Sequence, residues 1–303
     1  MRGRYPPAVD WRRVMRGTGR VLISAGVLIL LFVGYQLWGT GIAEARSQRS
    51  LMGDFELPRP ASTTPGTTAP PVTAPPPVPD GEAIAVIRIP KLGVEKAVVE
   101  GVALGDLKKG PGHYRDTPLP GQPGNSAIAG HRTTYGAPFY RLDELEPGDR
   151  ITVATRQGTF DYEVREQKVV RPSEVSVLDP TPDNRLTLTT CHPRFSARQR
   201  LIVVAALLGP AAPAPVPSTS TTAAPPGTIP GDPPSLDAGL SGQEASNGPA
   251  VMWGLLAALV WLATWAVSKR WRKWPAYVVG TPVFLVVLFV FFENFSRLLP
   301  ANY

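Results

Sequence analysis

Three long apolar runs divide the chain, and between the first two lies a region in which hydrophobic residues recur in short stretches. The long runs cover residues 21–38, 250–267 and 276–292. Each is close to the roughly 17–25 residues that an α-helix needs to cross a lipid bilayer. We therefore expect three transmembrane helices, which would make this a multi-pass protein of the cell membrane.

Residues 82–208 have the pattern of a β-rich domain of about 127 residues, enough for one folded unit. Short runs rich in β-branched and aromatic residues alternate with Gly, Pro and polar residues, which is typical of strands and turns. Helical turns fit at residues 104–109 and 139–145. Seven or eight short strands predict a closed or nearly closed β-barrel, which places this domain in the mainly β class. The strand-like runs are residues 83–89, 94–99, 126–130, 151–155, 159–170, 186–190 and 200–204.

Two proline-rich tracts flank this predicted domain. Residues 57–80 consist mostly of Pro, Thr, Ala and Val, and residues 209–248 are rich in Pro, Ala, Ser, Thr and Gly. Such compositions cannot bury a core and favour extended conformations. We interpret residues 39–81 as a short polar piece followed by a stalk, and residues 209–249 as a tether to the second membrane helix.

Basic residues indicate how the chain crosses the membrane. Residues 1–20 hold six arginines and one aspartate, and residues 268–275 hold two lysines and two arginines. Basic segments beside transmembrane helices face the cytoplasm, so residues 82–208 and the tail at 293–303 should be extracellular. The two segments carry +5 and +4, so the rest of the chain carries −2 of the formal net charge of +7. The charge thus indicates attraction to membrane lipids and argues against nucleic-acid binding.

A sequence that resembles a signal-peptidase site, Ala43-Glu44-Ala45, follows the first apolar run. The run is longer than the apolar region of a usual cleavable signal peptide, so we favour an uncleaved anchor. Cleavage after Ala45 is the alternative. The two carboxy-terminal helices would hold the protein in the membrane in either case.

Cys191 is the leading candidate for chemistry, and it is the only cysteine among 303 residues. It follows the alternating strand pattern of residues 186–190, and Arg200 opens the β-branched run at 200–204. If the two runs pair through the intervening loop, Cys191 and Arg200 should face each other at one end of the sheet. The alternative is an inert, buried cysteine that acts as a small hydrophobe.

A thiol is a strong nucleophile only as a thiolate, so Cys191 needs a neighbouring base or cation. His131 follows the apolar residues 126–130 and should lie at a barrel rim, so we prefer it as the partner. His113, in a Gly- and Pro-rich loop, could line the site. His192 should point to the opposite face of its strand from Cys191. The alternative for His131 is a structural histidine at a strand end.

A family resemblance rests on three segments taken together. They are the run TLTTC that ends at Cys191, the arginine at 200 before LIVV, and AIAGHRTTYGAPF around His131. Over residues 84–208 the chain resembles the sortase family of cysteine transpeptidases. The segment around His131 and GPGHYRDTPLPGQPGN at 110–125 are similar to class E sortases of actinobacteria. Proline-rich spacers and carboxy-terminal membrane helices depart from the simplest single-anchor layout, and a carboxy-terminal helix also occurs in class C sortases, which polymerise pilins.

This resemblance implies an eight-stranded sortase barrel with Cys191, His131 and Arg200 as the catalytic set. It implies Tyr114 and Thr190 as substrate contacts. Secreted proteins with a carboxy-terminal LAXTG- or LPXTG-like sorting signal would be cleaved between Thr and Gly through a thioacyl-enzyme. The acyl group would pass to an amine of a lipid-linked peptidoglycan precursor or, in the class C alternative, to a pilin lysine. We expect the other arginines of the loop, Arg194 and Arg198, to be solvated.

No cofactor is expected, because one cysteine and three scattered histidines argue against a zinc or haem site. A calcium site stays an alternative, because the loop before the Cys191 strand contains three carboxylates, Glu174, Asp179 and Asp183, that could supply oxygen ligands. Two other functions also stay open. One is a thiol hydrolase that passes the acyl group to water, and the other is a non-catalytic surface module that binds a peptide.

Overall fold

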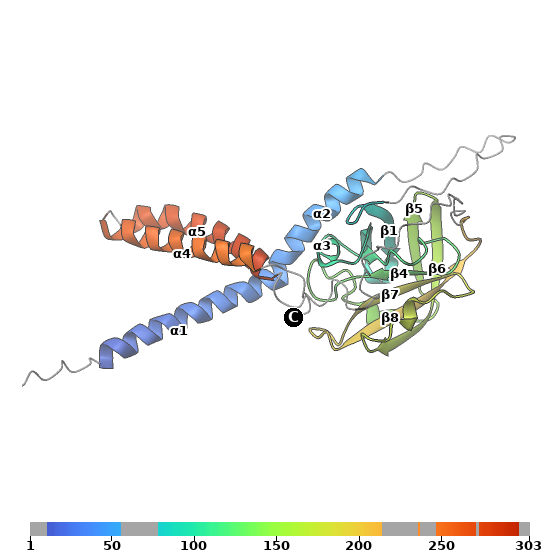
Figure 1. Cartoon of the computed structure of the whole chain (residues 1–303), viewed down its shortest axis with the longest axis horizontal. Coiled ribbons are helices and arrows are strands. Elements are labelled where there is room, and N and C mark those ends of the chain that lie inside the picture. Colours follow the sequence, from blue (N-terminus) through green and yellow to red (C-terminus); the bar gives the residue numbers. More distant parts are fainter. Residues whose placement is uncertain (1–10, 56–77, 214–235, 237–246, 271–272, 297–303) are drawn as a thin grey trace, which may run out of the picture.

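The computed structural model describes residues 11–55, 78–213, 236, 247–270 and 273–296 (Figure 1). Within these residues, eight strands close into a barrel in the order β1-β2-β3-β4-β7-β8-β6-β5, which confirms the predicted β-barrel. The β2–β3 and β4–β7 pairings are parallel, and the other pairings are antiparallel. The strands are β1 (Ala83–Ile89), β2 (Val94–Glu100), β3 (Gly112–His113), β4 (Asn125–Ala129), β5 (Arg150–Thr155), β6 (Gly158–Val170), β7 (Arg185–His192) and β8 (Gln199–Leu208).

Side chains alternate between the two faces of the barrel wall, and each face has its own apolar cluster. Leu186 and Leu188 of β7 lie in the interior cluster, with Ile128 of β4 and Val203 of β8. The alternate residues of these three strands form a second cluster, on the outer face. Cys191 belongs to this outer cluster, so the thiol lies outside the barrel core. The other members are Leu107, Tyr114, Ala127, Ala129, Val170, Leu178, Ile202, Val204 and Leu236.

Short helical turns cover the ends of the barrel. They are α3 (Leu104–Leu107) and the 3-10 turns η2 (Pro90–Leu92), η3 (Leu142–Glu144) and η4 (Val175–Leu178). The helix expected over residues 139–145 is reduced to η3. The N–H groups of Leu142, Glu144 and Leu145 donate to carbonyls three residues earlier in the chain, which is the pattern of a 3-10 turn rather than of an α-helix.

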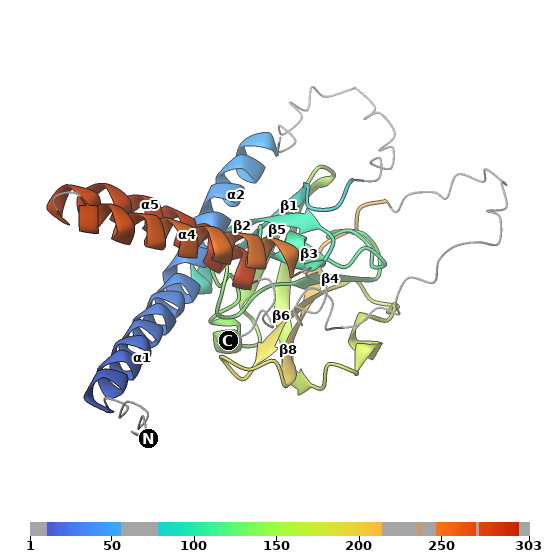
Figure 2. The same cartoon turned by 60° about the vertical axis from the view of Figure 1, so that its left-hand side comes forward.

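Among the described residues, three helices are long and apolar enough to cross a membrane, over Met15–Gly34, Gly248–Arg270 and Trp274–Ser296. They lie in α1 (Trp11–Gly34), α4 (Gly248–Arg270) and α5 (Lys273–Ser296). In both views α4 and α5 run side by side, and α1 projects separately from the same end of the barrel (Figure 2).

The polar piece after α1 has no clear pattern in the sequence, and yet it is helical. A π-helical turn, η1 (Tyr35–Gly39), joins α1 to α2 (Thr40–Asp54), which packs along the barrel beside β1 and β2 (Figure 1). The Gln48 amide donates to the Ala97 carbonyl at 3.0 Å and accepts from the Ala97 N–H at 2.7 Å. Glu44 pairs with Lys96 at 2.6 Å. These contacts fasten α2 to the edge of β2.

Residues on either side of the first proline-rich tract contact the barrel. Phe55, which follows α2, is buried in one cluster with Ala83 and Val86 of β1. Residues 56–77 and most of residues 214–246 lie outside the described residues, so the interpretation of the two tracts as stalk and tether stays a prediction.

Candidate active site

The antiparallel pairing of β7 with β8 brings Cys191 directly opposite Arg200. The turn between the strands comprises residues 193–198, and the pairing runs without a shift back to Arg185. The predicted register of this hairpin is confirmed. A thiol and a guanidinium therefore occupy facing positions at one end of the barrel wall.

The parallel pairing of β4 with β7 brings His131 to the same end of the wall. Ala129 pairs with Thr189, and the Gly130 N–H donates to the Thr189 carbonyl at 3.0 Å. Continued in this register, His131 follows beside Cys191, on the side of β7 that faces away from β8. Cys191 and Arg200 thus face each other across β7 and β8, and the register of β4 extended by two residues puts His131 next to Cys191 in the same row.

Gly130 and Phe139 shape the backbone just before His131. A Cβ atom on Gly130 would lie 2.6 Å from the Phe139 ring, so only glycine allows this close approach. Thr190 of β7 also fixes the backbone of Gly130, because its hydroxyl donates to the Gly130 carbonyl at 2.7 Å. The Thr190 side chain alternates with Cys191 and so lies on the opposite face of β7. The structure gives Thr190 a role in fixing the end of β4.

His131 is completely buried, and neither ring nitrogen has a hydrogen-bond partner among the described residues. Burial and, secondarily, the positive charge of Lys108 lower the pKa of His131 from 6.5 to about 3. The imidazole is therefore neutral at physiological pH. It can accept a proton, and an imidazolium formed there would readily give the proton up.

The loop after His131 reaches the membrane helices. The Tyr135 ring lies 5.1 Å from the His131 ring, centre to centre. The Tyr135 N–H donates to the Thr40 hydroxyl of α2 at 3.2 Å, and its phenol lies 3.5 Å from the Ser296 hydroxyl of α5. His131 is thus positioned by residues that also touch the anchoring helices.

Arg200 is also fully buried. Its Nη1 donates to the carbonyls of Ala197 and Gln199, each at 2.9 Å, and its Nε donates to the carbonyl of Leu236 at 3.1 Å. All three of these acceptors are uncharged. A guanidinium is a permanent, planar cation, so it is suited to stabilise an oxygen that becomes negative during a reaction.

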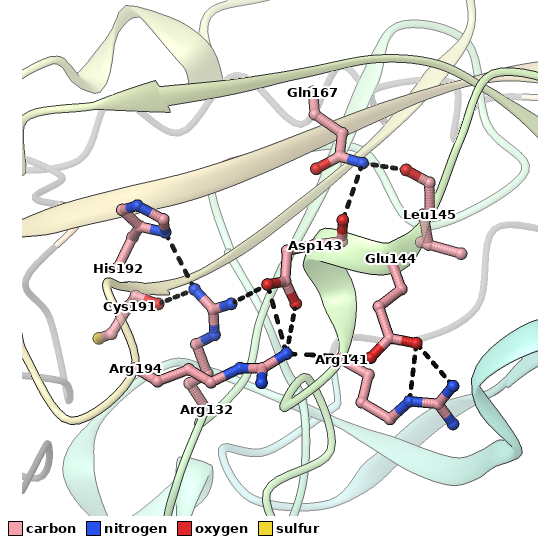
Figure 3. Close-up of polar contacts among 9 residues, drawn as sticks. All are labelled: Arg132, Arg141, Asp143, Glu144, Leu145, Gln167, Cys191, His192 and Arg194. Carbon is pink, nitrogen blue, oxygen red and sulfur yellow. Dashed lines mark hydrogen bonds and ion pairs between the residues drawn. The ribbon is translucent and has the colours of Figure 1, made fainter.

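Arg132, which the sequence reasoning missed, contacts Cys191, His192 and Asp143 (Figure 3). Its Nη1 donates to the Cys191 carbonyl at 3.1 Å and lies 3.1 Å from His192 Nδ1, while its Nη2 pairs with Asp143 at 2.9 Å. The Cys191 sulfur points away from this guanidinium. Arg132 therefore fixes the backbone of the cysteine and leaves the thiol on the other side. The sequence offered one signal for Arg132, namely that it directly follows His131. On an extended chain its side chain should therefore point to the opposite face from that of His131.

The same network changes the prediction for Arg194. Arg194 bonds Asp143 at 3.0 Å and lies over the Tyr140 ring at 4.5 Å, so it is more than a solvated loop residue. Burial would raise the pKa of Asp143, but the hydrogen bond from Arg194 and the charges of Arg132 and Arg194 hold it below its usual value. Arg198 is exposed, in line with the expectation for it.

The other two histidines lie away from the thiol. His113 is buried between Glu100, Thr117 and the Pro118 carbonyl. His192 contacts Arg132 on the other face of β7, and burial together with the Arg132 charge lowers its pKa.

Tyr114 belongs to the same outer-face cluster as Cys191 and is 5% exposed. This cluster continues into the loop before β7, where Leu178 is buried and Val175 is partly buried. The site therefore has an apolar wall on the side of β4 and a second wall from the β6–β7 loop.

An open groove of about 1010 Å³ lies beside the β7–β8 turn. It is lined by Arg171 and Ser173 from one loop and by Phe195, Arg198 and Gln199 from the turn and the start of β8. Its lining does not include His131, Cys191 or Arg200.

No group of three or more His, Cys, Asp or Glu side chains that could hold a metal ion occurs in the described part of the chain. Glu174, Asp179 and Asp183 do not form such a group. Asp183 instead pairs with Arg185 at 2.6 Å, and Glu174 accepts the Arg171 N–H at 3.1 Å.

Comparison with known proteins identifies the domain. Residues 87–208 match the family model described as the sortase domain. Sortase SrtE1 of Streptomyces coelicolor is 38% identical over 205 residues, which cover 62% of this chain and 55% of that relative. The chain thus spans about half the length of this relative. Sortase D of Bacillus subtilis is 32% identical over 174 residues, which cover 57% of this chain and 86% of that protein.

Two solved structures to which the chain is similar are described as sortases. The crystal structure of Sortase E1 from Streptomyces coelicolor, with a tripeptide in the active site, has 37% identity and a TM-score of 0.41, covering 43% of this chain and 90% of that one. The Clostridium perfringens Sortase D5 transpeptidase has 37% identity and a TM-score of 0.41, covering 44% of this chain and 83% of that one.

Proposed function

The chain belongs to the sortase family, and on this basis we propose that it is a membrane-anchored cysteine transpeptidase. It would cleave a sorting-signal peptide and join the new acyl end to an amine. The observation that carries the proposal is the strand register, which sets Cys191 of β7 opposite Arg200 of β8 and leads the segment after β4 to His131 beside them. It combines a nucleophile, a neutral base and a permanent cation at one end of the barrel.

In the first half of the reaction, His131 takes the thiol proton and the Cys191 sulfur attacks the Thr carbonyl of the signal. The carbonyl oxygen becomes negative, and the Arg200 guanidinium stabilises it. The His131 imidazolium then protonates the Gly nitrogen, the carbon–nitrogen bond breaks, and a thioester forms on Cys191. The low pKa of His131 favours this proton release.

In the second half, an amine enters in place of the departed Gly peptide. Neutral His131 accepts a proton from the amine as its nitrogen attacks the thioester carbonyl. The carbon–sulfur bond breaks, a new amide is released, and the proton returns to Cys191. Arg132 assists indirectly, because its bond to the Cys191 carbonyl holds the strand in place during both halves.

Similarity to Streptomyces sortases of class E supports an LAXTG-like signal, cut between Thr and Gly, with LPXTG as the related alternative. The acceptor in this proposal is the amine of a lipid-linked peptidoglycan precursor. Three apolar helices support a multi-pass anchor, with the barrel on the extracellular face. A reporter fused after Tyr303 should then be extracellular and one inserted near Arg272 cytoplasmic. If both reporters lay on the same side of the membrane, the model with three crossings would be contradicted.

The test is mass spectrometry of the products that the detergent-solubilised full chain forms from LAXTG and LPXTG peptides. Without an amine, we expect an adduct on Cys191 that hydroxylamine releases, and no adduct in Cys191→Ala. With diaminopimelate-containing and lysine-containing acceptors, the new amide identifies the amine that is used. A free carboxylic acid as the only product, whatever the amine, would show a thiol hydrolase. Peptide binding without any adduct would show a non-catalytic module.

A further inference from the structure

Leu236 lies far along the chain from the barrel strands and yet is buried against the active-site face. It belongs to the proline-rich tract between β8, which ends at Leu208, and α4, which begins at Gly248. Its relative exposure is 0%, and it is part of the outer-face apolar cluster that contains Cys191 and Ala129. Its backbone carbonyl accepts the Arg200 Nε–H at 3.1 Å.

Both contacts are made by groups that the proposed reaction needs. The Nε–H of Arg200 is a donor that a substrate carbonyl or its oxyanion would use. The apolar wall that covers the Leu236 side chain is the wall beside the thiol. A leucine with an adjacent carbonyl is also what a peptide substrate with an apolar residue would offer to this site.

We propose that Leu236 is a built-in competitor that occupies the peptide site of the resting enzyme. The proposal rests on the assignment of Cys191 and Arg200 to the active site. Leu236, in the tract between β8 and α4, thus binds the barrel of its own chain beside Cys191 and Arg200. A substrate has to displace Leu236 before its carbonyl can reach Cys191.

Tethering makes this competition effective even if the contact is weak. A segment of the same chain is present at an effective concentration that does not depend on the amount of protein, on the order of a millimolar for linked modules. The 1% exposure of Cys191 agrees with such coverage. The covered thiol is protected from water-borne oxidants and unrelated peptides, and a substrate held at high local concentration by the same membrane can displace Leu236.

The first test measures access to the thiol without requiring turnover. Cys191 is the only cysteine, so alkylation by iodoacetamide, followed by mass spectrometry, reports one site. We expect Leu236→Gly in the full-length chain to raise the alkylation rate about tenfold, equivalent to about 1.4 kcal/mol of lost occupancy. Leu240→Gly, at the other leucine of the tract, is the matched control and should alkylate at the wild-type rate.

The second test separates competition from a general loosening of the fold. A synthetic peptide of residues 232–240 should slow the alkylation of Leu236→Gly again, and the same peptide with Gly in place of Leu236 should not. With a sorting-signal peptide as substrate, Leu236→Gly should lower KM and leave kcat unchanged, because a competitor acts on binding alone.

The outcomes distinguish this inference from the proposed function. Equal alkylation rates and equal KM in wild type and Leu236→Gly, with normal transpeptidation, would overturn the competitor and leave the enzyme intact. Faster alkylation in Leu236→Gly, with no adduct or transfer in either protein, would overturn the proposed function and with it the competitor role. Faster alkylation that the leucine-containing peptide does not reverse would also overturn the inference.

Discussion

Two histidines of this barrel are almost completely buried, and their surroundings differ. His113 is 1% exposed and has a partner on each ring nitrogen. Its Nδ1 lies 3.3 Å from the Glu100 carboxylate, and its Nε2 lies 3.0 Å from the Pro118 carbonyl and 3.1 Å from the Thr117 hydroxyl. These contacts tie β3 to β2 and to the loop that follows.

His131 is 0% exposed and has no such partners among the described residues, although it lies at a comparable strand end. Buried polar groups are normally hydrogen-bonded, so an unsatisfied one costs stability and requires an explanation. At His113 the ring serves the fold. At His131 the protein tolerates an unsatisfied ring beside its only thiol, which is the arrangement expected of a group that exchanges protons with a substrate.

Replacement of His131 by Ala should have the largest effect. Both proton transfers lose their catalyst, so turnover should fall by about 10²–10⁴-fold, while the barrel stays folded because no described hydrogen bond to the ring is lost. Steady-state transpeptidation and the thermal midpoint from circular dichroism measure the two effects. Near-normal turnover combined with a much lower midpoint would make His131 a structural residue like His113.

Acidification should reveal the same histidine as a stability difference. With a folded pKa of about 3 and an ordinary value of 6.5, His131 binds its proton in the unfolded chain first as the pH falls. Its contribution is therefore fully present above pH 6.5 and declines towards pH 3, by about 1.4 kcal/mol per pH unit at most. The thermal midpoint of His131→Asn should accordingly fall less between pH 7 and pH 4 than that of wild type. Equal decreases of the thermal midpoint in both proteins would contradict the lowered pKa of His131.

His113→Ala should give the converse of the His131 result. The substitution leaves the Glu100 carboxylate buried without the imidazole, so the free energy of unfolding should drop by about 1–3 kcal/mol. Turnover of the folded protein should stay within a few-fold of wild type, because no described contact joins His113 to the catalytic row. Thermal unfolding and initial rates at a temperature below the midpoint test this. A loss of turnover without a loss of stability would place His113 in the site.

Two arginines extend the comparison, since Arg200 is buried in the row and Arg198 is exposed on the turn beside it. Arg200→Lys keeps the charge but loses the planar fork, so turnover should fall at least about tenfold, or roughly 1.4 kcal/mol of barrier. Arg198→Lys should be close to wild type. Equal losses in both variants would mean that the guanidinium facing Cys191 has no special part in the reaction.

Local patterns were sufficient for much of this site. The alternation in residues 186–190 and the arginine at the start of the next run predicted the Cys191–Arg200 register, because a hairpin pairs residues equidistant from its turn. The apolar run at residues 126–130 also predicted that His131 lies at a strand end. Its place beside Cys191 depends on the parallel β4–β7 pairing, which joins segments about 60 residues apart and has no local signature.

Other features depend on contacts that no single segment encodes. Arg132 forms its network only when Asp143 and the end of β7 come together. Thr190 and Cys191 are neighbours on β7, so their side chains lie on opposite faces of the strand. Thr190 accordingly donates to the Gly130 carbonyl on the face away from the thiol. Helix α2 lacked a strong apolar face, and it is held by Gln48 and Glu44, whose partners lie on β2 and in the loop after α3.

In the proposed membrane-anchored enzyme, the docking of α2 would also determine the height of the barrel above the bilayer. A helix of 15 residues extends about 22 Å, at 1.5 Å per residue, and α2 continues α1 without a break in helical structure. Because α2 is fastened to the barrel, the barrel would keep a fixed position relative to α1. Peptide bonds at the corresponding height above the lipid would then be within reach of Cys191, and those farther out would not.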